Sequence, residues 1–212
     1  MSSTMDAGSA FDGMFTAGSG RFVGSDGTFE HLAVRQWAGR TDLADRQLFI
    51  DHCSGPTIDL GCGPGRLISD LAERGIPALG IDVSAEAVRQ TRRRGVQALR
   101  LDVFDDVPGV GDWAHALLAD GNIGIGGDPV RLLSRARELL RPDGTALVEV
   151  SALGAGLVRD ERRLWVEGRF SSAFAWAVVG LDAIDEVARE AGFSVTAVRT
   201  VAGRHAVTLT AA

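Results

Sequence analysis

The sequence has no lysine and no tyrosine among its 212 residues, and only two cysteines, Cys53 and Cys62. Few cysteines, and an N-terminus without the basic and apolar segments of a secretion signal, predict a reduced cytoplasmic protein. No group of cysteines and histidines has the spacing of metal ligands, so we expect no metal site. No apolar run approaches the roughly 18 residues of a membrane span, so we expect no membrane contact.

Positive charge is scarce and comes from arginine alone. The 22 basic residues are outnumbered by 28 acidic ones, which gives a net charge of −6. The basic run Arg92 to Arg94 ends a predicted helix, where cations complement the helix dipole. We therefore expect no nucleic-acid partner, because such substrates usually require basic grooves.

A glycine-rich turn follows a buried strand in the stretch from Thr57 to Leu67. Gly61, Gly63 and Gly65 allow the backbone to turn sharply and to come close to a ligand before a helix begins. Asp82 follows at the end of the next predicted strand, where a carboxylate accepts hydrogen bonds from both hydroxyls of a ribose. Turn and aspartate together predict a nucleoside-binding strand–helix–strand unit.

The glycine spacing indicates which nucleoside is bound. A dinucleotide site has the pattern G-x-G-x-x-G, but here the pattern is G-x-G-x-G, and Arg66 occupies the position of the third dinucleotide glycine. Asp59, just before the turn, would repel a pyrophosphate and suits a cationic amino group instead. A ligand with a ribose, an ammonium group and no phosphate is S-adenosylmethionine (SAM).

At these residues the chain resembles the class I SAM-dependent methyltransferases. The stretch from Asp59 to Gly65 is similar to their first motif, and the stretch from Gly80 to Ser84 is similar to their second. The resemblance covers about residues 41–212 and implies a doubly wound α/β fold with a seven-stranded, mainly parallel sheet.

The pattern of elements predicts the same architecture. From Thr57 onward, predicted strands and helices alternate, which is typical of a parallel sheet covered on both faces. The last two strands are joined by a turn too tight for a crossover, so the final strand must be antiparallel. The strands are expected at 57–60, 77–82, 97–102, 115–119, 145–150, 193–200 and 204–210, and the helices at 64–74, 84–94, 129–140 and 182–191.

Two segments lie outside this pattern. Residues 1–40 are expected to form a flexible tail, as far as about residue 20, and then a hairpin at 21–32 that folds over the site as a lid. The domain at 41–212 is expected to begin with a helix that Thr41 caps, with Leu43 on its apolar face. It carries an inserted arm at about 151–180, which is expected to be antiparallel.

The resemblance assigns the cofactor contacts to the carboxyl ends of the strands. Asp59 would lie near the methionine amino group, and Asp82, followed by Val83, would hold the ribose. Asp102 and Val103 would contact the adenine, the first through its carboxylate and the second through its backbone N–H. The alternative for Asp102 is a strand-end cap. The cofactor would be SAM, and the full set of predicted contacts is Asp59, Gly61, Cys62, Gly63, Gly65, Asp82, Val83, Asp102, Val103 and Asp120.

The acceptor is expected beside the glycine-rich loop 120–127, where Asp120 or Asn122 would orient a hydroxyl or amine. The alternative is a flexible loop without a ligand. His205, at the start of the last strand, and His31, in the hairpin, are the candidates for removing a proton. His115 lies too far from the ligand edge and is expected to be a core residue.

The predicted function is methyl transfer from SAM to an oxygen or nitrogen atom of a small molecule. Two alternatives remain at this point: methylation of a protein or peptide side chain, and a SAM-binding regulatory subunit without catalysis. A general base is optional, because SAM is already activated and positioning supplies much of the rate. We expect a monomer or a homodimer.

Overall fold

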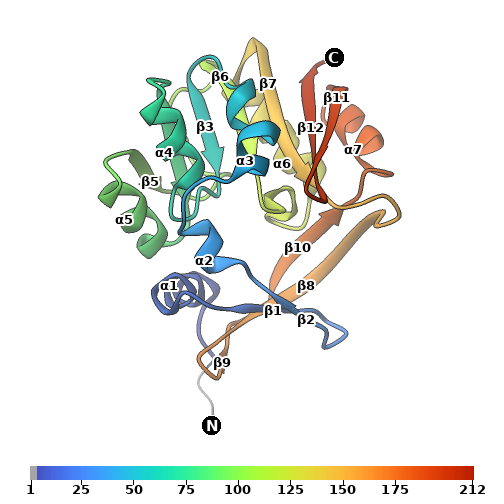
Figure 1. Cartoon of the computed structure of the whole chain (residues 1–212). Coiled ribbons are helices and arrows are strands. Elements are labelled where there is room, and N and C mark those ends of the chain that lie inside the picture. The colour runs from blue at the N-terminus through green and yellow to red at the C-terminus, as the bar shows by residue number, and fades with distance from the viewer. Residues whose placement is uncertain (1–3) are drawn as a thin grey trace.

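The computed structural model describes residues 4–212 and contains two sheets (Figure 1). The larger sheet has seven strands in the order β11-β12-β7-β6-β3-β4-β5. All its neighbours are parallel except β12, which is antiparallel to both β7 and β11, so the predicted doubly wound sheet is confirmed. Its strands are β3 (Thr57–Leu60), β4 (Ala78–Asp82), β5 (Gln97–Arg100), β6 (Trp113–Leu118), β7 (Leu140–Val150), β11 (Phe193–Val201) and β12 (Arg204–Ala211).

Helices cover both faces of this sheet because its strands are apolar on both sides. Along β6, Ala116 and Leu118 pack into the core beneath α6 (Pro129–Leu139) and α7 (Ile184–Glu190). The alternate residue Leu117 packs into a second core on the opposite face. That face is covered by α3 (Leu43–Leu48), the short helix η1 (Ile50–His52) and α4 (Arg66–Glu73), and α5 (Ala85–Arg93) follows β4.

The start of α3 differs from the prediction. Asp42, not Thr41, caps the helix, and Asp45 closes a reciprocal capping box with it. The Thr41 hydroxyl donates to Asp70 instead. Leu43 is 65% exposed, so it does not belong to the apolar face. A carboxylate is a stronger N-cap acceptor than a hydroxyl, which explains the shift by one residue.

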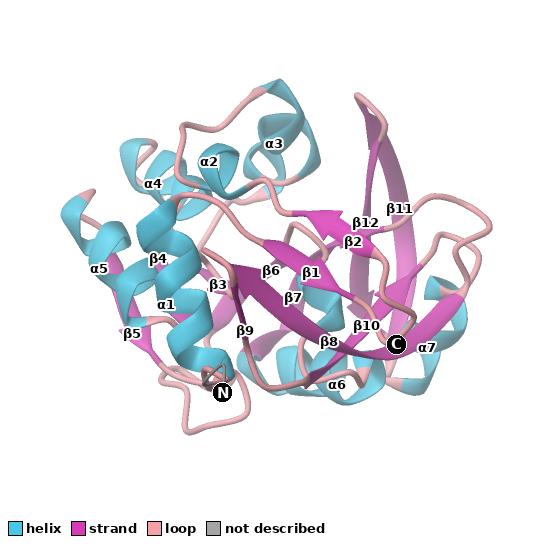
Figure 2. Cartoon of the chain, turned by 90° about the horizontal axis from the view of Figure 1, so that it is seen from below, coloured by secondary structure: helices cyan, strands magenta, loops and turns pink. Residues whose placement is uncertain are grey.

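The smaller sheet joins the N-terminal hairpin to the inserted arm (Figure 2). β8 (Leu157–Val166) pairs antiparallel with both β1 (Arg21–Val23) and β10 (Phe174–Val179). β2 (Phe29–His31) completes the predicted hairpin with β1, and β9 (Arg169–Phe170) pairs with β8. The structure contains the hairpin and the antiparallel arm, but their union in one sheet was not predicted.

Most of the expected flexible tail is a helix. α1 spans Ala7–Ala17, with Met14 and Phe15 buried against the smaller sheet, and a short helix α2 (Val34–Trp37) follows the hairpin. The glycines and the serine of α1 weaken its local helix preference, so tertiary packing decides the conformation of this segment. Residues 1–3 of the predicted tail lie outside the described residues. Within residues 4–212, no helix is long and apolar enough to cross a membrane.

Asp12 fastens α1 to the N-terminus of α5. Its Oδ1 accepts hydrogen bonds from the Ser84 hydroxyl at 2.6 Å and from the Glu86 backbone N–H at 3.0 Å. We expect Asp12→Ala to lower the free energy of unfolding by about 1 kcal/mol, as the loss of a helix cap does. Urea denaturation measures the change, and Asp112→Ala, at an exposed carboxylate, is the control. Equal stability of the two variants would contradict this role of Asp12.

Candidate active site

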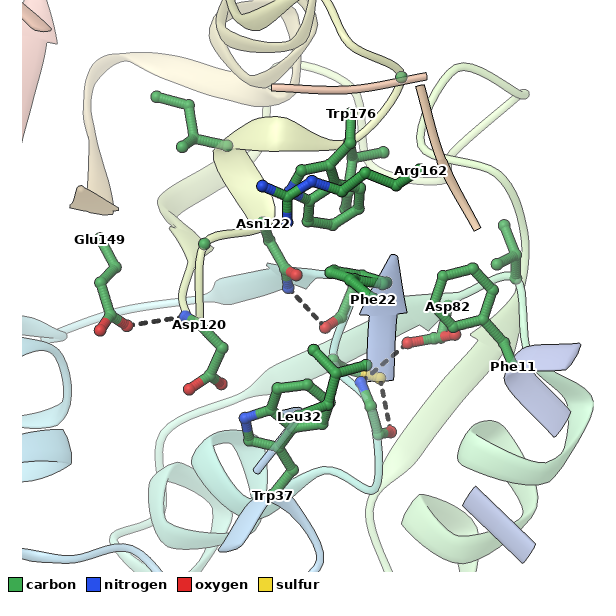
Figure 3. A pocket seen from close by; sticks show the side chains of 18 of the residues that line it. Phe11, Phe22, Leu32, Trp37, Asp82, Asp120, Asn122, Glu149, Arg162 and Trp176 are labelled. Atoms are coloured by element: carbon green, nitrogen blue, oxygen red, sulfur yellow. Dashed lines mark hydrogen bonds between the residues drawn. The ribbon is translucent and has the colours of Figure 1, made fainter. Parts of the chain in front are cut away.

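A cavity of about 740 Å³ lies between the carboxyl edge of the larger sheet and the smaller sheet (Figure 3). Ligands of open α/β sheets bind at this edge, and the volume is typical of small-molecule sites. Its floor includes nine of the predicted site residues: Gly61, Cys62, Gly63, Asp82, Val83, Asp102, Val103, Asp120 and Asn122. Its roof comes from α1, α2 and the smaller sheet. The loop 120–127, the arm and the N-terminal hairpin all contribute to the walls.

The glycine turn is packed too closely for side chains. Gly61 has a φ of 81°, and a Cβ there would lie 2.7 Å from the side-chain nitrogen of Asn122. Gly65 has the same φ, but its Cβ would meet Thr91 of α5 at 2.6 Å. Gly65 therefore serves helix packing and does not line the cavity, which corrects its assignment as a direct ligand contact. Gly61 and Gly63 do face the cavity.

Asp82 closes the turn against the second strand. Its Oδ2 accepts from the Gly63 backbone N–H at 2.9 Å, and its Oδ1 accepts from the Ser84 N–H at 2.8 Å. Burial raises the pKa of Asp82 to about 6, although these two donors lower it. Each carboxylate oxygen accepts more than one hydrogen bond, so Asp82 retains the capacity to hold a diol.

Asp102 and Val103 follow β5 at the next position along the sheet edge. Asp102 Oδ1 accepts from the Phe104 backbone N–H at 3.0 Å, as expected of a strand-end cap. Both residues also line the cavity, so the cap and the adenine contact are compatible. The adenine contact itself stays a prediction.

Asp59 is not on the cavity wall. It is 2% exposed on β3, and burial raises its pKa to about 7 against the opposing charge of Arg66. Asp59 therefore lies behind the cavity wall, and its position near the methionine amino group stays a prediction.

A network of ion pairs forms one end of the cavity. Arg66 donates two hydrogen bonds to Asp45, both at 2.9 Å, and two to Asp120, at 2.6 and 2.9 Å. Burial alone would raise the pKa of Asp45, but the hydrogen bonds and charges of Arg66 and Arg204 lower it to about 2. Removing one partner of such a buried pair typically costs about 3–5 kcal/mol.

Arg204 and Glu149 extend the network to the other strands. Arg204 donates to both carboxylate oxygens of Glu149, each at 2.8 Å, and to Asp45 at 2.7 Å. Glu149 also accepts from the Asp120 backbone N–H at 2.7 Å, which holds Asp120 at a φ of 54°. Asp45 and Glu149 were not among the residues predicted from the sequence. Glu149 lies near the end of β7, so the rule that selected the strand-end aspartates would also have found it.

The Asn122 side chain holds the loop 120–127 against the glycine turn. Its side-chain nitrogen donates to the carbonyl oxygens of Leu60, at 3.1 Å, and Gly61, at 2.8 Å. The amide nitrogen is thus committed to holding loop 120–127 against the glycine turn. The nitrogen is therefore not available to an acceptor. Orientation of an acceptor by the Asn122 side chain, which lines the cavity, stays a prediction.

Of the histidines considered as bases, the structure places one on the cavity wall and one away from it. His205 Nδ1 lies 2.9 Å from the Thr200 hydroxyl, and the ring does not line the cavity. Because side chains alternate along a strand, Arg204 faces the cavity and His205 faces away, so His205 is not the base. His31 lies on the cavity wall. His115 is a core residue bonded to Ser54 and Thr145, as predicted.

The raised pKa of Asp59 predicts a pH effect on stability. The folded protein keeps the Asp59 proton up to about pH 7, whereas the unfolded chain loses it near the ordinary value of 3.8. Between these values the folded state binds more protons, so its stability falls as pH rises. Asp59→Asn should reduce that fall, measured by urea denaturation at about pH 5 and about pH 8. An unchanged difference between the two pH values would refute the assignment, and Asp112→Asn is the control.

Part of the chain, including the glycine turn, is similar in sequence to known proteins. Residues 58–144 match the profile of a family described as "Methyltransferase domain". The trans-aconitate 2-methyltransferase of Rhodococcus jostii is 37% identical over 86 residues, which cover 40% of this chain and 30% of that protein. A tabtoxin biosynthesis enzyme of Pseudomonas amygdali is 34% identical over 93 residues, or 42% of this chain and 37% of the relative. The matches thus span roughly a third of these curated relatives.

Solved structures share the fold over more of the chain. A SAM-dependent methyltransferase of Bacteroides fragilis, in complex with S-adenosylhomocysteine, has a TM-score of 0.79 at 21% identity, covering 100% of this chain and 98% of that one. A 1,6-didemethyltoxoflavin-N1-methyltransferase of Burkholderia thailandensis has a TM-score of 0.55 at 21% identity, with 79% and 75% covered. Residues 58–144 therefore match a methyltransferase domain, and the chain as a whole shares the fold of the SAM-dependent methyltransferase from Bacteroides fragilis.

Proposed function

We propose that this protein transfers the methyl group of SAM to an oxygen or nitrogen atom of a small molecule. The observation that carries the proposal is the floor of the cavity. The glycine turn, Asp82 and Asp102 line it side by side, in the order that an amino-acid tail, a ribose and an adenine require. Relatives crystallised with S-adenosylhomocysteine support the same cofactor.

The net charge of the ion-pair network, at the end of the cavity next to the glycine turn, also supports SAM as the cofactor. The network has two guanidinium groups, Arg66 and Arg204, against three carboxylates, those of Asp45, Asp120 and Glu149. The buried Asp59 adds further negative charge when it ionises. A ligand with a sulfonium and an ammonium group offsets this excess, whereas a pyrophosphate would be repelled.

A small acceptor suits a cavity that is covered by a roof. Residues of α1, α2 and the smaller sheet cover the sheet edge, with Phe15 and Phe22 almost fully buried. A protein side chain would have to enter past this roof. The names of two relatives, for trans-aconitate and 1,6-didemethyltoxoflavin, point to small substrates in those proteins.

When SAM is bound, its sulfonium supplies an activated methyl group. The acceptor oxygen or nitrogen would take this methyl group, and the sulfur would keep the electron pair of the broken carbon–sulfur bond as a thioether. The acceptor proton leaves to solvent or to a cavity group such as His31. The chain's own contribution is to fix the cofactor by the turn and Asp82, and to exclude water beneath the roof.

Calorimetry tests the cofactor assignment. We expect micromolar binding of S-adenosylhomocysteine and no measurable binding of NAD or NADP, because Arg66 replaces the third dinucleotide glycine. Asp82→Ala should weaken binding by about 1–3 kcal/mol, the usual cost of losing charge-assisted hydrogen bonds. Asp112→Ala should bind as the wild type does. Tight NAD binding, or normal binding by Asp82→Ala, would overturn the assignment.

Asn122→Ala tests the support of the turn. Because the amide holds the Leu60 and Gly61 carbonyls, its loss should weaken S-adenosylhomocysteine binding as well as turnover. An effect of about 1 kcal/mol is expected for two neutral hydrogen bonds that share one donor group. A variant with normal cofactor affinity and lost turnover would show that Asn122 acts on the acceptor instead.

A further inference from the structure

The roof of the cavity is built from aromatic side chains of separate elements. Phe22 of β1 lies 5.1 Å from Trp176 and 5.8 Å from Phe174, both of β10, measured between ring centroids. Phe11 of α1 lies 5.6 Å from Phe174. All four rings line the cavity, opposite the polar floor. A surface of this kind favours a flat ring, which gains both apolar burial and ring–ring contact.

The Arg162 guanidinium lies beside these rings. Arg162 of β8 pairs in register with Phe174 and therefore shares its face of the smaller sheet. Its guanidinium lies 5.4 Å from the centre of the Phe22 ring, and its side chain is only 15% exposed. Figure 3 shows Arg162 and Trp176 on the same wall.

Within residues 4–212, Arg162 forms one ion pair, and its partner is weakly held. Hydrogen bonds lower the pKa of Asp26 and Asp160, and the charge of Arg162 lowers both further. The Arg162 Nη1 donates to Glu30 at 2.8 Å, and the Glu30 side chain is 62% exposed. Exposed partners of this kind contribute little to stability. The Nε and Nη2 groups of Arg162 donate to no group in the described part of the chain. A guanidinium that is mostly buried, stacked and only partly bonded is suited to bind a planar anion through two hydrogen bonds.

We propose, building on the methyltransferase function above, that the acceptor is a small aromatic or heteroaromatic molecule with a carboxylate substituent. Its ring packs among Phe22, Phe174 and Trp176, and its carboxylate binds the free side of the Arg162 guanidinium. The hydroxyl or amine to be methylated then points to the floor, where the cofactor methyl lies.

The chemistry of the roof disfavours other small acceptors. A cationic amine would meet the positive charge of Arg162 after losing its hydration. A neutral aliphatic molecule would leave the free guanidinium N–H groups unpaired on binding and would gain no ring contact. An aromatic carboxylate satisfies both the rings and the guanidinium.

The test measures ligand binding separately from cofactor binding. The wild type, Arg162→Gln and the control Arg163→Gln are first titrated with S-adenosylhomocysteine; Arg163 is the next residue of β8 and is exposed on its other face. A panel of hydroxybenzoates and aminobenzoates, each matched with its benzamide, is then titrated by calorimetry into the protein saturated with S-adenosylhomocysteine.

We expect at least one benzoate to bind the wild type and Arg163→Gln about tenfold or more tightly than its benzamide, and Arg162→Gln to lose this preference while keeping its affinity for S-adenosylhomocysteine. If S-adenosylhomocysteine binds but no benzoate does, or if the preference survives in Arg162→Gln, the acceptor assignment is wrong and the proposed function stands. If the wild type does not bind S-adenosylhomocysteine, the proposed function itself fails.

Discussion

The Arg66 guanidinium is the interaction on which the site depends. It lies at the first turn of α4, directly after the glycine turn, and it bonds to Asp45 of α3 and to Asp120 at the end of β6. Through Asp45 it connects with Arg204 of β12, and so with Glu149 of β7. One buried side chain thus fixes the relative positions of two helices and three strand ends around the cavity. The same residue rules out the third glycine of a dinucleotide site, so it sets geometry and ligand class together.

The roof depends on a different kind of constraint. β1 and β8 pair although well over 100 residues separate them, and neither the hairpin nor the arm has enough apolar surface to be stable alone. Their union buries Phe22 and Leu164, and α1 completes this small core with Met14. The roof of the cavity therefore exists only when both segments are assembled over the sheet.

The floor was predictable because its signals are local. Period-two apolar patterns, glycine punctuation and aspartates at strand ends placed Asp82, Asp102 and Asp120 on one edge, and the cavity brings them together. The network was not predictable, because Asp45 meets Arg66 and Arg204 across 21 and 159 residues of sequence. The prediction of His205 as a base was wrong by a single position. Because side chains alternate along β12, Arg204 faces the cavity and His205 faces away from it. The prediction of a flexible tail was wrong for α1. Its composition gives only a weak local preference for a helix, and contacts with β8 and α5 decide its conformation.

The central claim is that the floor holds SAM and the roof holds a small acceptor, and label transfer tests it most directly. The protein is incubated with methyl-labelled SAM and a metabolite extract, and the low-mass and protein fractions are analysed separately. The account predicts label in one or a few low-mass compounds, and much less label when Asp82→Ala replaces the wild type. Label confined to the protein fraction, or none in any fraction from a protein that binds S-adenosylhomocysteine, would contradict it.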